Sequence, residues 1–284
     1  MVNRRKTFEL ASTTVRLLAA LMLLASLASA HDGLHEQIAE VTARIKRAPL
    51  DATLYLKRGE LYRLHQDWRR ADADYTRAAR LQPALAVVDL ARGKMLFEAG
   101  RPQSAKVPLD RFLLKQPQDV EALVTRARVL VKLGRRTEAG QEFTTAISLT
   151  STPQPELYIE RARSLADDPG SNTSNTIEAL RGIDEGLTKL GSLVTLQLYA
   201  VELELRRKNY DAALARLETV AAQSPRKETW LFSRGEILLL AGRKIAAHEA
   251  FVSALTALES LPKHSRRTRA IADLEARLRT ALAP

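Results

Sequence analysis

Apolar residues recur along this chain every three or four positions, in stretches of about a dozen residues separated by short segments that often contain glycine or proline. This spacing predicts helices with one apolar face, and few stretches alternate with the two-residue period of a strand. The pattern also repeats at a longer interval, because Pro49, Pro83 and Pro117 are 34 residues apart. The same interval separates Gly59, Gly93 and Ala127, and also Ala71, Ala105 and Ala139. A period of this length indicates a solenoid, in which each unit buries its apolar face by stacking on its neighbours.

Within one period, small and large residues occupy fixed places. Residues 52–85 contain small Gly59, Ala71 and Ala78, large Tyr55, Tyr62 and Tyr75, and finally Pro83. These spacings resemble the tetratricopeptide repeat, in which two antiparallel helices approach closely at the small residues and a proline ends the second helix. Further copies are predicted at residues 86–119, 120–153, 155–191, 194–227 and 228–261. The second copy departs from the family pattern at Phe112, and the fourth carries a turn-forming insertion at 168–175.

The resemblance implies an all-α, right-handed α-solenoid of about six helix-turn-helix repeats over residues 52–262. Each end has a further apolar helical stripe that is too short for a complete repeat. We expect an N-terminal half-repeat, a capping helix, within residues 31–51, and a C-terminal capping helix within 263–284. The stripes consist of Leu34, Ile38, Val41 and Ile45, and of Ile271, Leu274, Leu278 and Leu282.

Residues 1–30 are typical of a cleavable export signal. Basic residues come first, an apolar run follows from Leu17 to Leu27, and Ala28-Ser29-Ala30 fits the small-residue cleavage rule. The mature chain would begin at His31 and be periplasmic or secreted, without a membrane span. An uncleaved anchor is the alternative, although the apolar run is short for a bilayer. Arg4-Arg5 resembles a twin-arginine signal, but the following phenylalanine lies one place later than that motif prefers, so we expect the general secretory route.

The chain is basic and lacks cysteine. Its formal net charge is +11, and removal of residues 1–30, with four positive charges and one negative charge, leaves +8. Export and the absence of an aromatic-studded basic platform argue against nucleic acid as a partner. Without cysteine, disulfides, thiolate metal sites and thiol catalysis are excluded.

Catalytic chemistry has no sequence signal here. The chain has no nucleophile elbow, phosphate loop, dinucleotide fingerprint or HExxH helix, so we expect neither an enzyme nor a cofactor. One minority alternative remains at the expected mature N-terminus, where the amine and imidazole of His31 could chelate copper, with His35 one helical turn away. The alternative without metal is a solvated, frayed end.

An arginine recurs just before the small residue of the first helix in five copies. If the column is functional, its arginines would form a row of anion-binding sites along the repeats. The simpler alternative is ion pairing with acids on the paired helix, such as Asp74 in the first copy and Glu142 in the third. The column consists of Arg58, Arg92, Arg126, Arg161 and Arg234.

The resemblance implies a concave groove lined by one face of each first helix. We predict that its binding residues are apolar columns around a basic stripe: Leu56, Leu90, Lys94, Phe97, Val124, Arg128, Val131, Ile159, Arg163, Leu198 and Phe232. Such a surface suits a peptide or protein with apolar anchors and acidic residues opposite Lys94, Arg128 and Arg163. The family's clamp for a C-terminal carboxylate is not matched, because Leu56 and Glu60 occupy its first positions. Alternatively, some of these apolar residues form core between adjacent first helices.

The sequence therefore predicts a non-catalytic scaffold or adaptor of the cell envelope that holds a protein segment in this groove. A periplasmic assembly factor or chaperone, which would engage many clients through the apolar columns, is the alternative.

Overall fold

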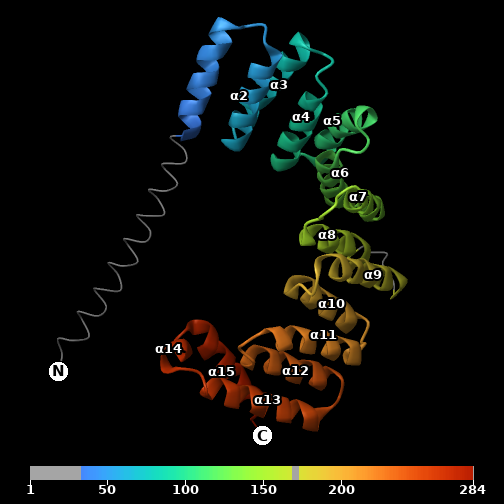
Figure 1. The fold of residues 1–284 in the computed structure, drawn as a ribbon, viewed down its shortest axis with the longest axis vertical. Helices are drawn as coiled ribbons and strands as arrows, with labels where there is room; N and C mark the ends of the chain where they lie inside the picture. The colour runs from blue at the N-terminus through green and yellow to red at the C-terminus, as the bar shows by residue number, and fades with distance from the viewer. Residues whose placement is uncertain (1–32, 168–172, 284) are drawn as a thin grey trace, which may run out of the picture. The chain divides into compact units, whose positions relative to one another are not determined.

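A computed structural model describes residues 33–167 and 173–283 of the chain (Figure 1). These residues form helices and turns and include no strand, which confirms the all-α prediction. The chain divides into two compact units, residues 1–129 and residues 130–284. The predicted export signal, His31 and most of the predicted insertion lie outside the described residues. No helix in the described part is both long and apolar enough to cross a membrane.

The first unit consists of a helix over residues 33–47 followed by pairs of helices. The first helix packs its predicted stripe, with Val41 and Ile45 buried, against Leu54 and Leu61. The paired helices are α2 (Ala52–Leu64) with α3 (Trp68–Leu81), and α4 (Val87–Glu98) with α5 (Pro102–Lys115). The next helix, α6 (Val120–Lys132), contains the boundary between the units.

The second unit continues the same alternation of helices. Its last helix, α15, packs on α13 and covers the end of the apolar core through Ile271, Leu274 and Leu278. The helices are α7 (Arg136–Ser148), α8 (Pro155–Ala166), α9 (Thr173–Leu190), α10 (Val194–Arg206), α11 (Tyr210–Gln223), α12 (Glu228–Leu240), α13 (Lys244–Glu259), α14 (Lys263–Arg266) and α15 (Arg269–Ala281).

The repeated small residues explain how the two helices of a pair pack closely. A Cβ atom added at Gly59 in α2 would lie 2.6 Å from Cε1 of Tyr75 in α3, so this position requires the absence of a side chain. The ring of Tyr75 is fully buried. Ala71 of α3 is also fully buried, as are its counterparts 34 and 68 residues later, Ala105 and Ala139. These are the contacts that the 34-residue interval specifies.

The structure refines two of the predicted boundaries. Helix α9 begins at Thr173, so the end of the predicted insertion at 168–175 is helical, and Asn175, the predicted cap, lies inside the first turn of the helix. The C-terminal segment contains two helices, α14 and α15, because the chain turns at Arg267 and Thr268. Phe112, which departs from the family pattern, is buried in α5.

Candidate functional site

Four members of the arginine column are paired with carboxylates. Arg58 donates through Nε and Nη2 to the two carboxylate oxygens of Asp74, each at 2.7 Å, which confirms the predicted pair in the first copy. Asp74 is buried, so this bidentate pair is shielded from water. The other printed pairs join Arg92 to Asp72, Arg126 to Asp110 and Arg161 to Glu185. Ion pairing therefore accounts for these four arginines.

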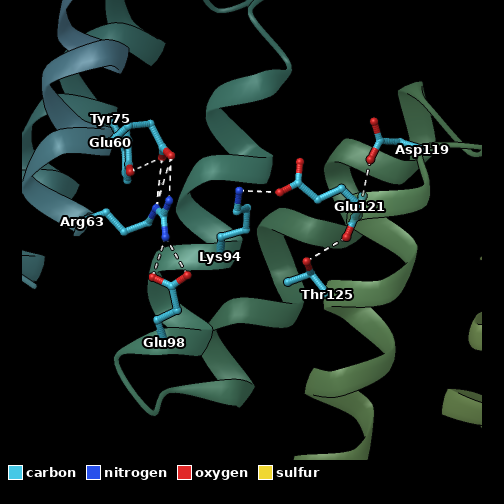
Figure 2. A network of polar contacts seen from close by, with 9 residues as sticks. Glu60, Arg63, Tyr75, Lys94, Glu98, Asp119, Glu121 and Thr125 are labelled. Atoms are coloured by element: carbon cyan, nitrogen blue, oxygen red, sulfur yellow. Dashed lines mark hydrogen bonds and ion pairs between the residues drawn. The ribbon is translucent and has the colours of Figure 1, made fainter. Parts of the chain in front are cut away.

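A polar network links the first helices of the first two repeats (Figure 2). Arg63 of α2 donates to Glu98 of α4 at 2.6 Å and to Glu60 of its own helix at 3.0 Å. Tyr75 of α3 donates its hydroxyl to Glu60 at 2.5 Å. Burial raises the pKa of the Tyr75 hydroxyl well above its usual range, and the hydrogen bond to the Glu60 carboxylate raises it further. The charges on this part of the first-helix face are therefore compensated within the chain.

Lys94, the first basic residue of the predicted stripe, is also engaged within the unit. Its Nζ lies 2.5 Å from Oε1 of Glu121 at the start of α6 (Figure 2). The start of α6 is itself fixed, because the Asp119 carboxylate accepts from the backbone N–H of Ala122 and the Thr125 hydroxyl donates to the Glu121 carbonyl. An acidic partner residue at Lys94 would have to compete with Glu121.

The predicted groove residues differ in their exposure. Those on the surface are Arg128, Arg163 and Leu198. Those half-buried are Leu56, Lys94, Phe97, Val131 and Ile159. Those buried are Leu90, Val124 and Phe232, and they contribute mainly to packing between helices. Each unit thus keeps some of the predicted groove residues at its surface. In the second unit, these exposed residues are the basic Arg163 and the apolar Leu198.

In the second unit, exposed Arg163 of α8 lies over the buried ring of Tyr199 in α10. The guanidinium carbon of Arg163 lies 5.3 Å from the ring centroid of Tyr199, and Leu198, which precedes Tyr199 in the chain, is 37% exposed. Burial raises the pKa of the Tyr199 hydroxyl to about 12, and Asp167 adds to the effect. Phe232 of α12 is covered instead, since Arg277 of α15 lies 4.4 Å from its ring centroid.

A small apolar cleft lies between α11 and α12, and we call it the Trp230 cleft. The leucine and tryptophan side chains that line it pack in the hydrophobic core of the second unit. Its other large lining residues are charged. Its volume is about 220 Å³. The lining consists of Leu214, Leu217, Glu218, Ala221, Lys227, Trp230, Leu231 and Arg234.

Arg234 is the member of the arginine column that lies at this cleft. It is exposed, and within residues 33–167 and 173–283 it makes neither an ion pair nor a hydrogen bond through its side chain. Lys227, also on the cleft, donates to the backbone carbonyl of Ala221 and has no carboxylate partner in the described chain. The Trp230 cleft therefore combines preformed apolar walls with two cations that make no ion pair with any described residue, although Glu218 also lines the cleft.

Sequence reasoning did not identify this cleft, although one signal was present. The chain has only two tryptophans, and both line hollows: Trp230 this cleft, and Trp68 a hollow of about 750 Å³ that His65 and Met95 also line. No group of three or more metal-ligating side chains occurs among the described residues. The proposed copper ligand His31 lies outside them.

Comparison with known proteins supports the predicted repeat. A family model described as a tetratricopeptide repeat matches residues 90–154 and 200–262. No curated protein matches the chain.

Several solved structures share the fold. A tetratricopeptide repeat protein from Parabacteroides merdae ATCC 43184 superimposes with a TM-score of 0.53 at 20% identity, covering 87% of this chain and 92% of that one. YrrB, described as having an unusual peptide-binding site, gives 0.53 at 18% identity, with 74% and 96% covered. Pseudomonas aeruginosa pilF gives 0.51 at 13% identity, with 80% and 97% covered. At these identities the similarity is one of fold.

Proposed function

Because the chain is a tetratricopeptide repeat protein, we propose that it is a non-catalytic scaffold of the cell envelope that binds a segment of another protein. The observation that carries the proposal is the Trp230 cleft, where no described carboxylate pairs with Arg234 as one does with each of its four counterparts.

The size of the cleft points to the kind of ligand. Its volume of about 220 Å³ is below the range of roughly 300–1,000 Å³ that is typical of small-molecule pockets. It suits one bulky apolar side chain of a partner, such as leucine or phenylalanine. Anchors of this kind supply most of the binding energy in protein interfaces, and the walls cost little to order because they already belong to the core.

The charges of the cleft specify the residue beside the anchor. An aspartate or glutamate next to the apolar side chain would reach the guanidinium of Arg234, with Lys227 adding to the positive potential. The ligand is therefore a protein segment with an apolar anchor and an adjacent acid. This agrees with the ligand chemistry predicted for the groove, and Leu198 and Arg163 provide a second candidate surface for it.

The experiment is a selection from a random peptide library against chain 31–284, followed by titrations of the selected peptides. We expect peptides with a large apolar residue next to Asp or Glu. Trp230→Ala and Arg234→Glu should each weaken binding at least about tenfold, while Arg267→Glu, the same charge change at an exposed arginine of the turn after α14, should leave it unchanged.

Two other outcomes would redirect the proposal. Binding that is lost in Leu198→Ala and Arg163→Glu but not in the cleft variants would transfer the site to the first-helix face. Apolar peptides without any acidic preference, bound weakly and in large number, would favour the chaperone alternative. The envelope location rests on the sequence of residues 1–30, and N-terminal sequencing of the protein from fractionated cells tests it, with His31 the expected first residue.

A further inference from the structure

The end of the chain carries much of its positive charge. Residues 263–284 contain six lysines and arginines and two acidic residues, so their net charge is +4. This is half of the net charge of +8 that would remain after removal of residues 1–30. Four of the six cations lie close together in α14, in the turn after it and at the start of α15: Lys263, Arg266, Arg267 and Arg269. We call these four residues the C-terminal basic patch.

Ion pairing within the described chain does not account for the patch. Lys263, Arg266 and Arg267 make no ion pair with any residue that the structure describes. Arg269 lies 3.8 Å from Asp273, but the two side chains are 94% and 68% exposed, so water screens this pair. Nε of Arg266 is buried, and no described group accepts a hydrogen bond from it. The patch thus differs from the four arginines of the repeat column, which have carboxylate partners.

The core of the second unit holds the patch in place. Leu261 before it and Ile271 after it pack in the same apolar cluster. Between them, the backbone N–H of Ser265 donates to the Pro262 carbonyl at 2.9 Å, and the Thr268 hydroxyl donates to the Ser265 carbonyl at 3.3 Å. Helix α14 contacts α15, and both lie at one edge of the second unit (Figure 1). The cations are therefore displayed from a folded turn and not from a frayed end.

The surroundings of the patch favour a lipid surface over other anions. None of its four residues lines the Trp230 cleft or the hollow beside α15 that Trp230 and Ile271 also line, so the patch offers charge without the buried pocket that protein partners need. Residues 263–284 contain no phenylalanine, tyrosine or tryptophan on which bases could stack. A bilayer with anionic headgroups requires neither feature, because its charge attracts surface cations over about 10 Å at an ionic strength of about 0.1 M.

We propose that the C-terminal basic patch docks the second unit on an anionic lipid surface of the cell envelope. The proposal rests on the envelope location proposed above and adds a second surface to the Trp230 cleft. Helix α15 turns its apolar side chains Ile271, Leu274 and Leu278 into the core, so docking uses the attraction of headgroups and not insertion of the helix. Docking is therefore sensitive to salt, which shortens the range of this attraction to about 3 Å at about 1 M.

The test is sedimentation of chain 31–284 with lipid vesicles. At about 0.1 M salt we expect binding to vesicles of phosphatidylcholine and phosphatidylglycerol in a ratio of about two to one, no binding to phosphatidylcholine alone, and release at about 1 M salt. Arg267→Glu combined with Arg269→Glu should weaken binding at least about 25-fold, because each basic residue near an anionic surface contributes about fivefold. Lys115→Glu combined with Lys132→Glu, the same charge change at exposed lysines of α5 and α6, is the matched control and should stay within about twofold of the parent.

The patch variant is chosen so that its fold survives. Both arginines are exposed, and Arg269→Glu places a carboxylate at the first residue of α15, where the helix dipole favours it, so circular dichroism should be unchanged. The patch variant should also still bind the peptides selected for the Trp230 cleft. Absence of vesicle binding with intact peptide binding would therefore reject the lipid surface and leave the proposed scaffold standing.

Three results would overturn the proposal. One is equal binding to the anionic vesicles and to phosphatidylcholine alone. Another is an equal loss of binding in the lysine control, because the net charge of the chain and not the patch would then be responsible. The third is tighter binding to a single-stranded oligonucleotide than to the anionic vesicles, which would make the patch a nucleic-acid surface.

Discussion

The close approach of paired helices makes a sharp prediction about two glycines in the second unit. Gly235 lies in α12, and a Cβ atom there would come within 2.6 Å of Cδ1 of Phe251 and closer still to Cε1. Gly140 lies in α7, where an added Cβ would meet Cδ2 of Leu165 at 3.4 Å, an ordinary contact. Replacing either residue with alanine gains about 0.5–1 kcal/mol from the more restricted unfolded chain and the higher helix propensity. Only the first replacement creates a steric conflict.

The magnitude follows from these two contributions. Phe251 is 2% exposed and has little room to move, so the added methyl group costs about 1–3 kcal/mol in displaced packing. Gly235→Ala should therefore be neutral to about 2 kcal/mol less stable than the parent, whereas Gly140→Ala should be about 0.5–1 kcal/mol more stable. The difference between the two variants, about 1–3 kcal/mol, is the quantity to measure.

The assay uses urea unfolding followed by tryptophan fluorescence. In a Trp68→Phe background, Trp230 is the only tryptophan and reports on the second unit alone. The assay therefore does not require the two units to unfold together. Adding Phe251→Leu should reduce the cost of Gly235→Ala, because the ring atoms that conflict with the methyl group are gone. Equal stability of Gly235→Ala and Gly140→Ala would refute the reasoning, since it would mean that the interface of α12 and α13 yields freely.

Three further predictions concern the polar contacts of the first unit. Asp74→Ala should lower the free energy of unfolding by about 2–4 kcal/mol, because it leaves Arg58 half-buried without its bidentate partner; denaturant titration measures this. Lys94→Ala should cost less than about 1 kcal/mol in the same titration, because Glu121 is 58% exposed and water replaces the pair. Above pH 10.0, the pKa of a tyrosine in the unfolded chain, Tyr75 keeps its proton in the folded state and loses it in the unfolded state, because burial raises its pKa. The free energy of unfolding therefore falls by about 1.4 kcal/mol for each pH unit above 10.0. Unfolding midpoints at pH 9, 10 and 11 should show a shallower decline for Tyr75→Phe than for the parent.

The regular part of the fold could be predicted from the sequence because the contacts that define it recur. The pairing of Gly59 with Tyr75 is repeated wherever the chain places a small residue opposite a large one at the same spacing, so one pattern specifies many interfaces. The ion pair of Arg58 with Asp74 could be predicted for the same reason, since both residues lie within one repeat.

Contacts between neighbouring repeats were harder to predict. Lys94 carries the charge expected of the groove, but whether it faces a ligand or Glu121 depends on how α4 lies against α6, and the helical period does not specify this. Likewise, Leu90 and Leu198 occupy equivalent positions in their repeats, yet Leu90 is 6% exposed and Leu198 is 37% exposed. One column of residues therefore contains both core and surface.

The pairing state of the basic residues decides where an acidic ligand gains most. At Lys94 a ligand carboxylate would replace Glu121, so one ion pair is exchanged for another and the net gain in free energy is small. At Arg234 no ion pair with a described residue would be lost, and the adjoining apolar walls would exclude water from one side of the new contact, which strengthens the attraction. The same residue type at the same position of the repeat is thus paired with a carboxylate in four copies, whereas at the Trp230 cleft the described residues supply Arg234 with no such pair. Restoring a local partner should remove that advantage. Leu231 lies three residues before Arg234 in α12, so the carboxylate of Leu231→Glu would lie within reach of the guanidinium. Leu231→Glu should therefore weaken an acidic ligand more than Leu231→Gln, which removes the same part of the apolar wall without adding a charge.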